Sequence, residues 1–263
     1  MLTLTQDMLF AGRYRIVRSI ASGGMGAVYE VEHVETSRHH ALKVLLPSLV
    51  DRQEIRDRFK QEARITATIE SEAIVQVFDA GVDTDTGMPF LVMELLRGED
   101  LAKVVARDGP LPPAKVVGYL MQAATALDKT HAAKVVHRDL KPENLFLSTR
   151  EDGSEQVKIL DFGVAKLLVE GAAGSNATSG FGTPLYMAPE QFKCTGVCPA
   201  TDIYSLGMIA FTLLVGTPYW EPEVAQRGTV FAFATLAVNG TREPASRSEE
   251  HTSELQSRGL ISY

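Results

Sequence analysis

The stretch His137-Arg138-Asp139-Leu140-Lys141-Pro142-Glu143-Asn144 decides how the rest of this chain is interpreted. It places a carboxylate, an ammonium group and a carboxamide within six residues, and Asp161-Phe162-Gly163 begins 22 residues after Asp139. Phosphoryl transfer from a nucleotide needs these groups, because a carboxylate orients the attacking hydroxyl, a cation neutralises the moving phosphoryl, and oxygen ligands bind magnesium. A charged surface turn is the alternative, but a chance turn does not account for both the order and the spacing.

The stretch resembles the catalytic loop of eukaryotic-type protein kinases. The sequences Ser22-Gly23-Gly24-Met25-Gly26 and Met187-Ala188-Pro189-Glu190-Gln191 resemble the corresponding stretches of bacterial members of that family. The resemblance covers residues 14–220 and implies an α+β, two-lobed fold. Its parts would be a β-rich N-lobe over 14–95 and a larger helical C-lobe over 96–246, with ATP and Mg²⁺ in the cleft.

The resemblance also implies residue roles and partners. Asp139 would be the base that positions the acceptor, and Lys141 would stabilise the moving phosphoryl and mark serine/threonine specificity. Asn144 and Asp161 would bind Mg²⁺. The implied partners are protein substrates with Ser or Thr hydroxyls, and a second copy of the chain for autophosphorylation.

A glycine-rich turn lies between two expected strands, 14–21 and 27–33, which are rich in Val, Ile and Tyr. Glycine lets backbone N–H groups approach phosphate oxygens closely, although an ordinary hairpin turn is the commoner explanation. The family pattern G-x-G-x-x-G-x-V, with alanine at its first position, implies nucleotide contacts for Ala21, Ser22, Gly23, Gly24, Gly26 and Val28.

A third expected strand, 39–45, carries Ala41 and Lys43. Apolar residues then recur at helical spacing over 51–70, and Glu62 falls within that stripe. A carboxylate in a buried stripe is costly unless it is paired. The resemblance makes Lys43 its partner and a ligand of the α- and β-phosphates; a solvated Glu62 is the alternative.

Strands are also expected over 74–80 and 89–95, leading into the segment that resembles the kinase hinge. By resemblance, Met93 is the residue at the back of the adenine pocket, or simply a core residue. Glu94 and Leu96 then border the adenine, and Asp100 contacts the ribose or caps a helix.

Three further elements are expected in the C-lobe. A helix over 112–134 precedes the catalytic loop, and a hairpin joining 145–147 to 157–160 brings Asn144 close to Asp161. A helix over 202–215 is apolar nearly all round, which places it in the centre of a lobe. Asp202 either caps that helix or, by resemblance, holds the catalytic-loop backbone.

Residues 161–190 match an activation segment, whose middle is small, polar and glycine-rich. A flexible linker is the alternative. Phosphorylation of such a loop orders it through a basic partner, here Arg138. The candidate phosphosites are Ser175, Thr178 and Ser179, and Thr183 is expected in the substrate groove.

Composition narrows the class of protein. The 263 residues include 45% hydrophobic residues, and the net charge is −7, which gives no electrostatic case for binding nucleic acid or an anionic membrane. There is no membrane-length apolar run or signal pattern, and the two cysteines are too few for a zinc site or a disulfide scaffold. We therefore expect a cytoplasmic chain.

The two ends fit the pattern least well. Residues 1–13 are interpreted as a leader, and 247–263 as a non-native tail that resembles a translated sequencing adapter, with a genuine polar tail as the alternative. The C-lobe is therefore interpreted as truncated. We expect the helix near 202 to lose apolar cover and Glu190 to lack its family partner, an arginine. A pseudokinase scaffold and an inert fragment are the competing functional hypotheses.

Overall fold

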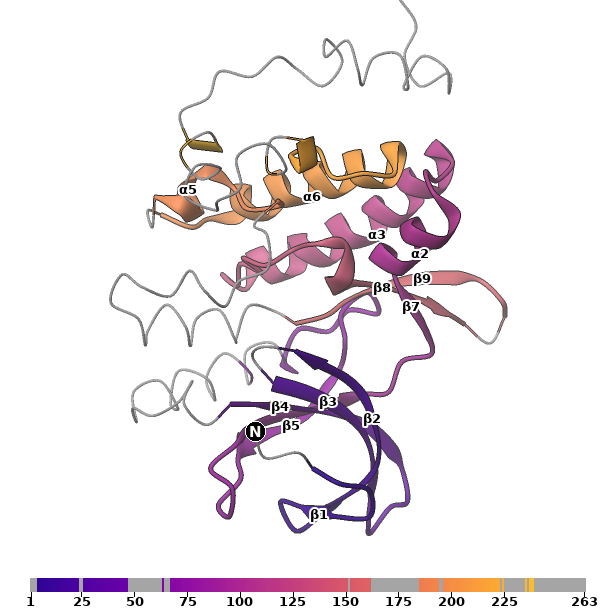
Figure 1. Ribbon diagram of the computed structural model, residues 1–263, viewed down its shortest axis with the longest axis vertical. Helices are drawn as coiled ribbons and strands as arrows, with labels where there is room; N and C mark the ends of the chain where they lie inside the picture. The colour runs from indigo at the N-terminus through magenta and orange to yellow at the C-terminus, as the bar shows by residue number, and fades with distance from the viewer. Residues whose placement is uncertain are drawn as a thin grey trace, which may run out of the picture.

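The computed structural model describes residues 4–23, 26–46, 63, 67–150, 152–161, 185–193 and 196–222, and the single positions 224, 235, 237 and 238. They form two lobes, a sheet lobe and a helical lobe, as Figure 1 shows. This is the α+β arrangement that the sequence predicts. The predictions for Gly24, Glu62, 162–184 and 247–263 lie outside the described residues.

The sheet lobe is a six-stranded antiparallel sheet with the strand order β1-β2-β3-β4-β6-β5. Its strands are β1 (Leu9–Phe10), β2 (Tyr14–Gly23), β3 (Gly26–His33), β4 (His39–Leu45), β5 (Val77–Val82) and β6 (Pro89–Glu94). The expected strands are confirmed, except that β5 begins three residues later than the pattern indicates.

The first described residues belong to this lobe. β1 pairs with β2, Leu4 and Phe10 are buried, and the Phe10 ring packs edge-on against Phe90 with the ring centroids 5.4 Å apart. The interpretation of residues 1–13 as a separate leader is therefore wrong over 4–13. The segment is too short to show a strand period, so its burial depends on long-range packing.

β4 divides its side chains between two apolar clusters, because alternate residues of a strand point to opposite faces. Leu42 and Val44 pack with Phe10 and Phe90 in a cluster that lies within the sheet lobe. Ala41 and Leu45 pack on the opposite face, which places Lys43 on that face as well. This second face looks toward the helical lobe and lines the predicted nucleotide site.

One glycine of the β2–β3 hairpin is required by close packing. A Cβ at Gly26 would lie 2.0 Å from the carbonyl oxygen of Val44, whereas a Cβ at Gly23 would meet nothing within 4 Å. We expect Gly26→Ala to lower the free energy of unfolding by about 1–3 kcal/mol, since backbone must move to relieve the clash. Gly23→Ala is the matched control and should change it by less than about 0.5 kcal/mol. Urea unfolding of the two variants measures the difference, and equal midpoints would contradict the clash.

The helical lobe begins after the chain leaves β6. Its elements are β7 (Gly98–Asp100), α2 (Leu101–Asp108), α3 (Pro113–Ala132), the 3₁₀ turn η2 (Pro142–Asn144), β8 (Leu145–Thr149), β9 (Glu155–Ile159), α5 (Pro189–Phe192) and α6 (Pro199–Val215). β7, β8 and β9 form a small sheet that lies between α3 and the sheet lobe in Figure 1. The predicted β8–β9 hairpin is confirmed by its register, which pairs Leu145 with Ile159.

α3 and α6 pack together at the centre of this lobe. Ala123 and Leu127 of α3 and Ile209 and Leu213 of α6 are fully buried in one cluster. α6 begins at Pro199, three residues before the predicted start, with Cys198 at its N-cap position, so the alternative that Asp202 caps the helix is wrong. No helix among the described residues combines the length and apolar character needed to cross a membrane.

The expected loss of cover on α6 is wrong for several of its apolar residues. Ile203 is 53% exposed, but Leu206 is only 8% exposed and Leu213 is fully buried. Trp220, which is 3% exposed, forms a further cluster with Ala237. Met208 packs against that cluster, so residues that follow α6 cover part of it.

Candidate active site

The catalytic-loop backbone is held by one buried carboxylate from α6. Asp202 is fully buried, its Oδ2 accepts hydrogen bonds from the backbone N–H of His137 (2.8 Å) and from His131 Nε2 (2.7 Å), and its Oδ1 accepts one from the N–H of Arg138 (2.9 Å). Buried carboxylates need such partners. The role that the resemblance assigns to Asp202 is confirmed.

His137 supports the same loop as a neutral imidazole. Its Nδ1 accepts a hydrogen bond from the backbone N–H of Asp139 (3.3 Å), so the proton is on Nε2, which donates to the carbonyl of Leu160 (2.7 Å). Burial lowers the pKa of His137, and this effect outweighs the opposing attraction of Asp202. The ring therefore ties the catalytic loop to the residue that precedes Asp161.

Asp139, Lys141 and Asn144 converge, as the sequence predicts. Asn144 Nδ2 donates to the backbone carbonyl of Asp139 (2.7 Å) and to its Oδ2 (3.3 Å), and Lys141 Nζ lies 3.5 Å from the same oxygen. The Asp139 and Lys141 side chains are each more than a third exposed, whereas Asn144 is buried. A fixed carboxamide thus orients a carboxylate that solvent and substrates can reach.

Asp161 faces the sheet lobe and pairs with Lys43 across the cleft. The Nζ of Lys43 lies 2.7 Å from Asp161 Oδ1. Burial opposes ionisation of Asp161, but the charge and hydrogen bond of Lys43, with help from His137 and Lys141, hold its pKa below the usual value. The expected Lys43–Glu62 ion pair falls outside the described residues.

The two predicted metal ligands are close together, and their chemistry fits Mg²⁺. The Leu160 N–H donates to the Asn144 carbonyl (2.9 Å), which brings the residue before Asp161 against Asn144. Because Asn144 Nδ2 is engaged by Asp139, its amide oxygen is the atom left for a cation. A carboxylate and an amide oxygen are hard ligands of the kind that Mg²⁺ prefers.

The apolar residues predicted for the nucleotide pocket form one cluster. Ala41 and Met93 are buried in it, and Val28 and Leu96 pack against it from β3 and from the segment after β6. Leu160 joins them from the helical lobe. The site residues of both lobes therefore meet on one apolar surface.

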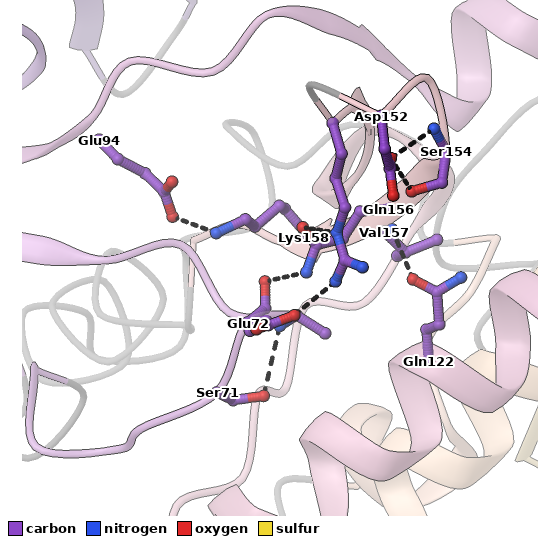
Figure 2. Close-up of polar contacts among 11 residues, drawn as sticks. Ser71, Glu72, Glu94, Gln122, Asp152, Ser154, Gln156, Val157 and Lys158 are labelled. Atoms are coloured by element: carbon purple, nitrogen blue, oxygen red, sulfur yellow. Dashed lines mark hydrogen bonds and ion pairs between the residues drawn. The ribbon is translucent and has the colours of Figure 1, made fainter.

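Glu94, at the end of β6, pairs its side chain with a lysine of the helical lobe. Figure 2 shows Lys158 of β9 reaching Glu94, with Nζ 2.6 Å from Oε1. The same oxygen accepts the backbone N–H of Gln76 (2.8 Å). The Oε1 atom of Glu94 is therefore engaged, and an adenine contact through the Glu94 backbone stays a prediction.

Neighbouring contacts in Figure 2 join the segment before β5 to the β8–β9 hairpin. Gln156 Nε2 donates to the carbonyl of Glu72 (2.7 Å). Within the helical lobe, Gln122 of α3 accepts the N–H of Val157 (3.0 Å) and holds the hairpin against that helix. Arg150 also pairs with the Glu72 carboxylate. The two lobes are thus fastened together beside the hinge.

The remaining residues predicted for the nucleotide pocket lie at the start of α2 and in the β2–β3 hairpin. Asp100 caps α2, accepting the N–H of Lys103 (2.9 Å), so the helix-cap alternative is confirmed and a ribose contact stays a prediction. Ala21, Ser22 and Gly23 are exposed in the β2–β3 hairpin.

Two histidines with lowered pKa values are expected to make the protein less stable at acid pH. Burial, with the positive charges of His33, Arg38 and His39, lowers the pKa of His40, and burial also lowers that of His137. The unfolded chain binds these protons near the ordinary pKa of about 6.5, so stability is full above that pH and is lost as the pH falls below it. We expect the urea midpoint to drop between pH 7.5 and 5.5, and to drop less in His40→Gln. The same pH dependence in both proteins would contradict this origin.

Segment 185–193 is anchored to α6 through hydroxyl groups. Thr201 Oγ1 donates to Glu190 Oε1 (2.6 Å), and Ser205 Oγ donates to the carbonyl of Tyr186 (2.7 Å). Glu190 is therefore hydrogen-bonded by a buried hydroxyl of α6, whereas the expected lack of its arginine partner stays a prediction.

Sequence reasoning missed several positioning residues. His131 of α3 contacts Asp202, Gln191 of α5 contacts the catalytic loop, and Lys158 contacts Glu94. Only Gln191 carried a signal, because it is the last residue of the quoted stretch Met187-Ala188-Pro189-Glu190-Gln191.

Comparisons with known proteins agree with this geometry. A family model described as a protein kinase domain matches residues 14–258, which extends beyond residue 220, where the recognised motifs end. The chain is 44% identical over 205 residues to the serine/threonine-protein kinase Pkn1 of Myxococcus xanthus, covering 78% of this chain and 29% of Pkn1. It is 38% identical over 217 residues to PknL of Mycobacterium tuberculosis, covering 81% of this chain and 52% of PknL.

The chain therefore spans about half or less of the length of these two relatives. Among solved structures, the crystal structure of the Mycobacterium tuberculosis PknI kinase domain is similar, with a TM-score of 0.67 and 26% sequence identity. That match covers 97% of this chain and all of the other.

Proposed function

The chain belongs to the protein kinase domain family, and from that premise we propose that it transfers the γ-phosphoryl group of Mg-ATP to serine or threonine hydroxyls of proteins. The observation that carries the proposal is the convergence of Asp139, Lys141 and Asn144, with Asp161 and Lys43 facing them across the cleft. Bacterial relatives named as serine/threonine kinases support the substrate class.

In this proposal, each residue acts through its placement. Asp139 accepts the proton of the acceptor hydroxyl and orients its oxygen toward the γ-phosphorus, while Asn144 fixes the carboxylate. Lys141, beside the same carboxylate, neutralises charge on the moving phosphoryl. Mg²⁺, held by Asn144 and Asp161, would neutralise charge on the phosphate oxygens.

Lys43 would have three anionic partners in this scheme, namely Asp161, the nucleotide phosphates and Glu62. Its ammonium group pairs with Asp161 in the described structure, and we propose that it also contacts the α- and β-phosphates when ATP is bound. Asp161 would also be a ligand of Mg²⁺, so it would keep a cationic partner where Lys43 contacts the phosphates. The partner Glu62 remains part of the proposal.

The direct test is transfer of labelled γ-phosphate from ATP to a serine- or threonine-containing protein substrate. We expect label on the substrate that depends on Mg²⁺ and is lost on chelation. Nucleotide binding without any transfer would favour the pseudokinase scaffold. A protein that neither binds ATP nor transfers phosphate would favour the inert fragment.

We also propose autophosphorylation within residues 175–183, by a second copy of the chain. The candidate sites are Ser175, Thr178 and Ser179, and Arg138 is the basic group suited to receive a phosphate. Mass spectrometry of active protein should find phosphate between Asp161 and Glu190, with Thr178 as the first candidate. Active protein without phosphate in that interval would contradict the proposal. We further propose a cytoplasmic location.

A further inference from the structure

We propose that Gln191 is a positioning residue that fixes the peptide unit joining Arg138 to Asp139. The inference rests on the proposed function in one respect, namely that Asp139 is the base. The structural part of the inference is one hydrogen bond, here called the latch, that joins segment 185–193 to the catalytic loop. Gln191 Nε2 forms that latch by donating to the Arg138 carbonyl oxygen over 2.7 Å.

The residue that precedes the base has an unusual backbone. Arg138 has φ of +66°, in the left-handed region, where a residue with a Cβ costs about 1–2 kcal/mol. Such a conformation persists only where its surroundings hold it. Asp202 accepts the Arg138 N–H (2.9 Å) and Gln191 donates to its carbonyl, so the backbone is held on both sides.

The Arg138 carbonyl shares a rigid peptide plane with the N–H of Asp139. That N–H donates to His137 Nδ1 (3.3 Å), so the plane is held at both of its polar ends. A rotation of this plane would break both hydrogen bonds and change ψ of Arg138 and φ of Asp139, the backbone angles beside the proposed base. Of the two, the Gln191 bond is the shorter and comes from outside the loop.

Gln191 is itself held in place within segment 185–193. Its Oε1 accepts the N–H of Ala188 (3.1 Å), which assigns the amide orientation, since the backbone N–H can only donate. Thr201 and Ser205, one turn apart on α6, anchor the same segment through Glu190 and the Tyr186 carbonyl.

α6 therefore carries both parts of the site. Asp202 holds the catalytic loop, and the neighbouring hydroxyl groups of Thr201 and Ser205 hold segment 185–193. Gln191 is a direct link between these two parts. The Gln191 side chain contacts Ala188 and the Arg138 carbonyl, so we expect loss of the link to alter turnover rather than ATP affinity.

Gln191→Glu is the sharpest variant, because it keeps the length of the side chain and the oxygen that caps Ala188 but cannot donate to Arg138. We expect kcat for peptide phosphorylation to fall between about tenfold and a hundredfold. The Kd for ATP and the Tm should stay close to those of the wild type. Gln191→Met, which is uncharged and of similar volume, should lower kcat in the same way, and Lys193→Gln, on the exposed end of the same segment, should leave it unchanged.

Hydrogen exchange tests the latch without relying on activity. Gln191→Glu and Gln191→Met should both speed exchange at the Asp139 amide at least tenfold, while α3 amides stay protected. Unchanged kcat in an active enzyme, or unchanged exchange at Asp139, would overturn the inference, as would equal losses of Tm, ATP affinity and kcat. A wild-type protein that transfers no phosphate would refute the proposed function instead, and the exchange result would still decide the latch.

Discussion

Asp139→Asn is expected to lower the rate of protein phosphorylation by about 10²–10⁴-fold while leaving the Kd for ATP within about twofold. The carboxamide keeps the shape of the side chain and can still contact Asn144, but it cannot accept the proton of an acceptor hydroxyl. Asp139 stands beside Lys141 and Asn144 rather than within the apolar nucleotide cluster, so ATP binding should survive. Steady-state transfer and equilibrium ATP titration measure the two quantities separately.

The matched control for this variant is Asp152→Asn, which makes the same change at an exposed position in the β8–β9 turn. Because the hydrogen bonds of the Asp152 side chain go to Ser154 of the same turn, turnover of the Asp152→Asn variant should equal that of the wild type. Equal turnover in wild type and Asp139→Asn would refute the role of Asp139 as the base.

The largest expected loss of stability is that of Asp202→Ala, at about 3–5 kcal/mol in the free energy of unfolding. The change removes the acceptor of two backbone N–H groups and of His131, and leaves these donors buried without a partner. The whole stability of a domain is about 5–15 kcal/mol, so the loss should be visible as a large fall in the urea midpoint. Activity should fall with it, because the catalytic-loop backbone loses its anchor.

Ile203→Ala is the control on the next residue of the same helix. Its side chain is 53% exposed, and the substitution should cost less than about 0.5 kcal/mol. Asp202→Asn should lie between the two, since an amide oxygen can still accept some of the hydrogen bonds. If Asp202→Ala unfolded at the wild-type urea concentration, the anchoring role of this carboxylate would be refuted.

Local sequence determined the elements that carry their own pattern. In β4 the apolar pairs Ala41-Leu42 and Val44-Leu45 flank Lys43 and predict a strand, so the place of Lys43 follows from that strand. Likewise, the turn at 152–154 between two apolar runs predicts the β8–β9 hairpin, which then brings Asn144 and Asp161 together. In these cases the residues that interact are close in sequence, so backbone geometry alone limits where they can lie.

Side-chain pairing across the fold was beyond such local reasoning, and only the family resemblance indicated one such pair, that of Asp202 with the catalytic loop. The carboxylate of Asp202 bonds to His137, 65 residues away, and Gln191 bonds to Arg138, 53 residues away. The packing of Leu4 and Phe10 into the sheet lobe is of the same kind. A motif can name one partner of such a pair, but not the distance to the other.

The sequence by itself therefore determined the family, the order of strands and helices, and the set of groups that could do phosphoryl transfer. Only the tertiary structure decided which residues hold the site in place. Lys158 pairs with Glu94, Thr201 bonds to Glu190, and Gln191 holds the Arg138–Asp139 peptide. The physical reason is that a buried polar group needs a partner but does not specify which one. Packing of α6 against the catalytic loop and segment 185–193 makes that choice.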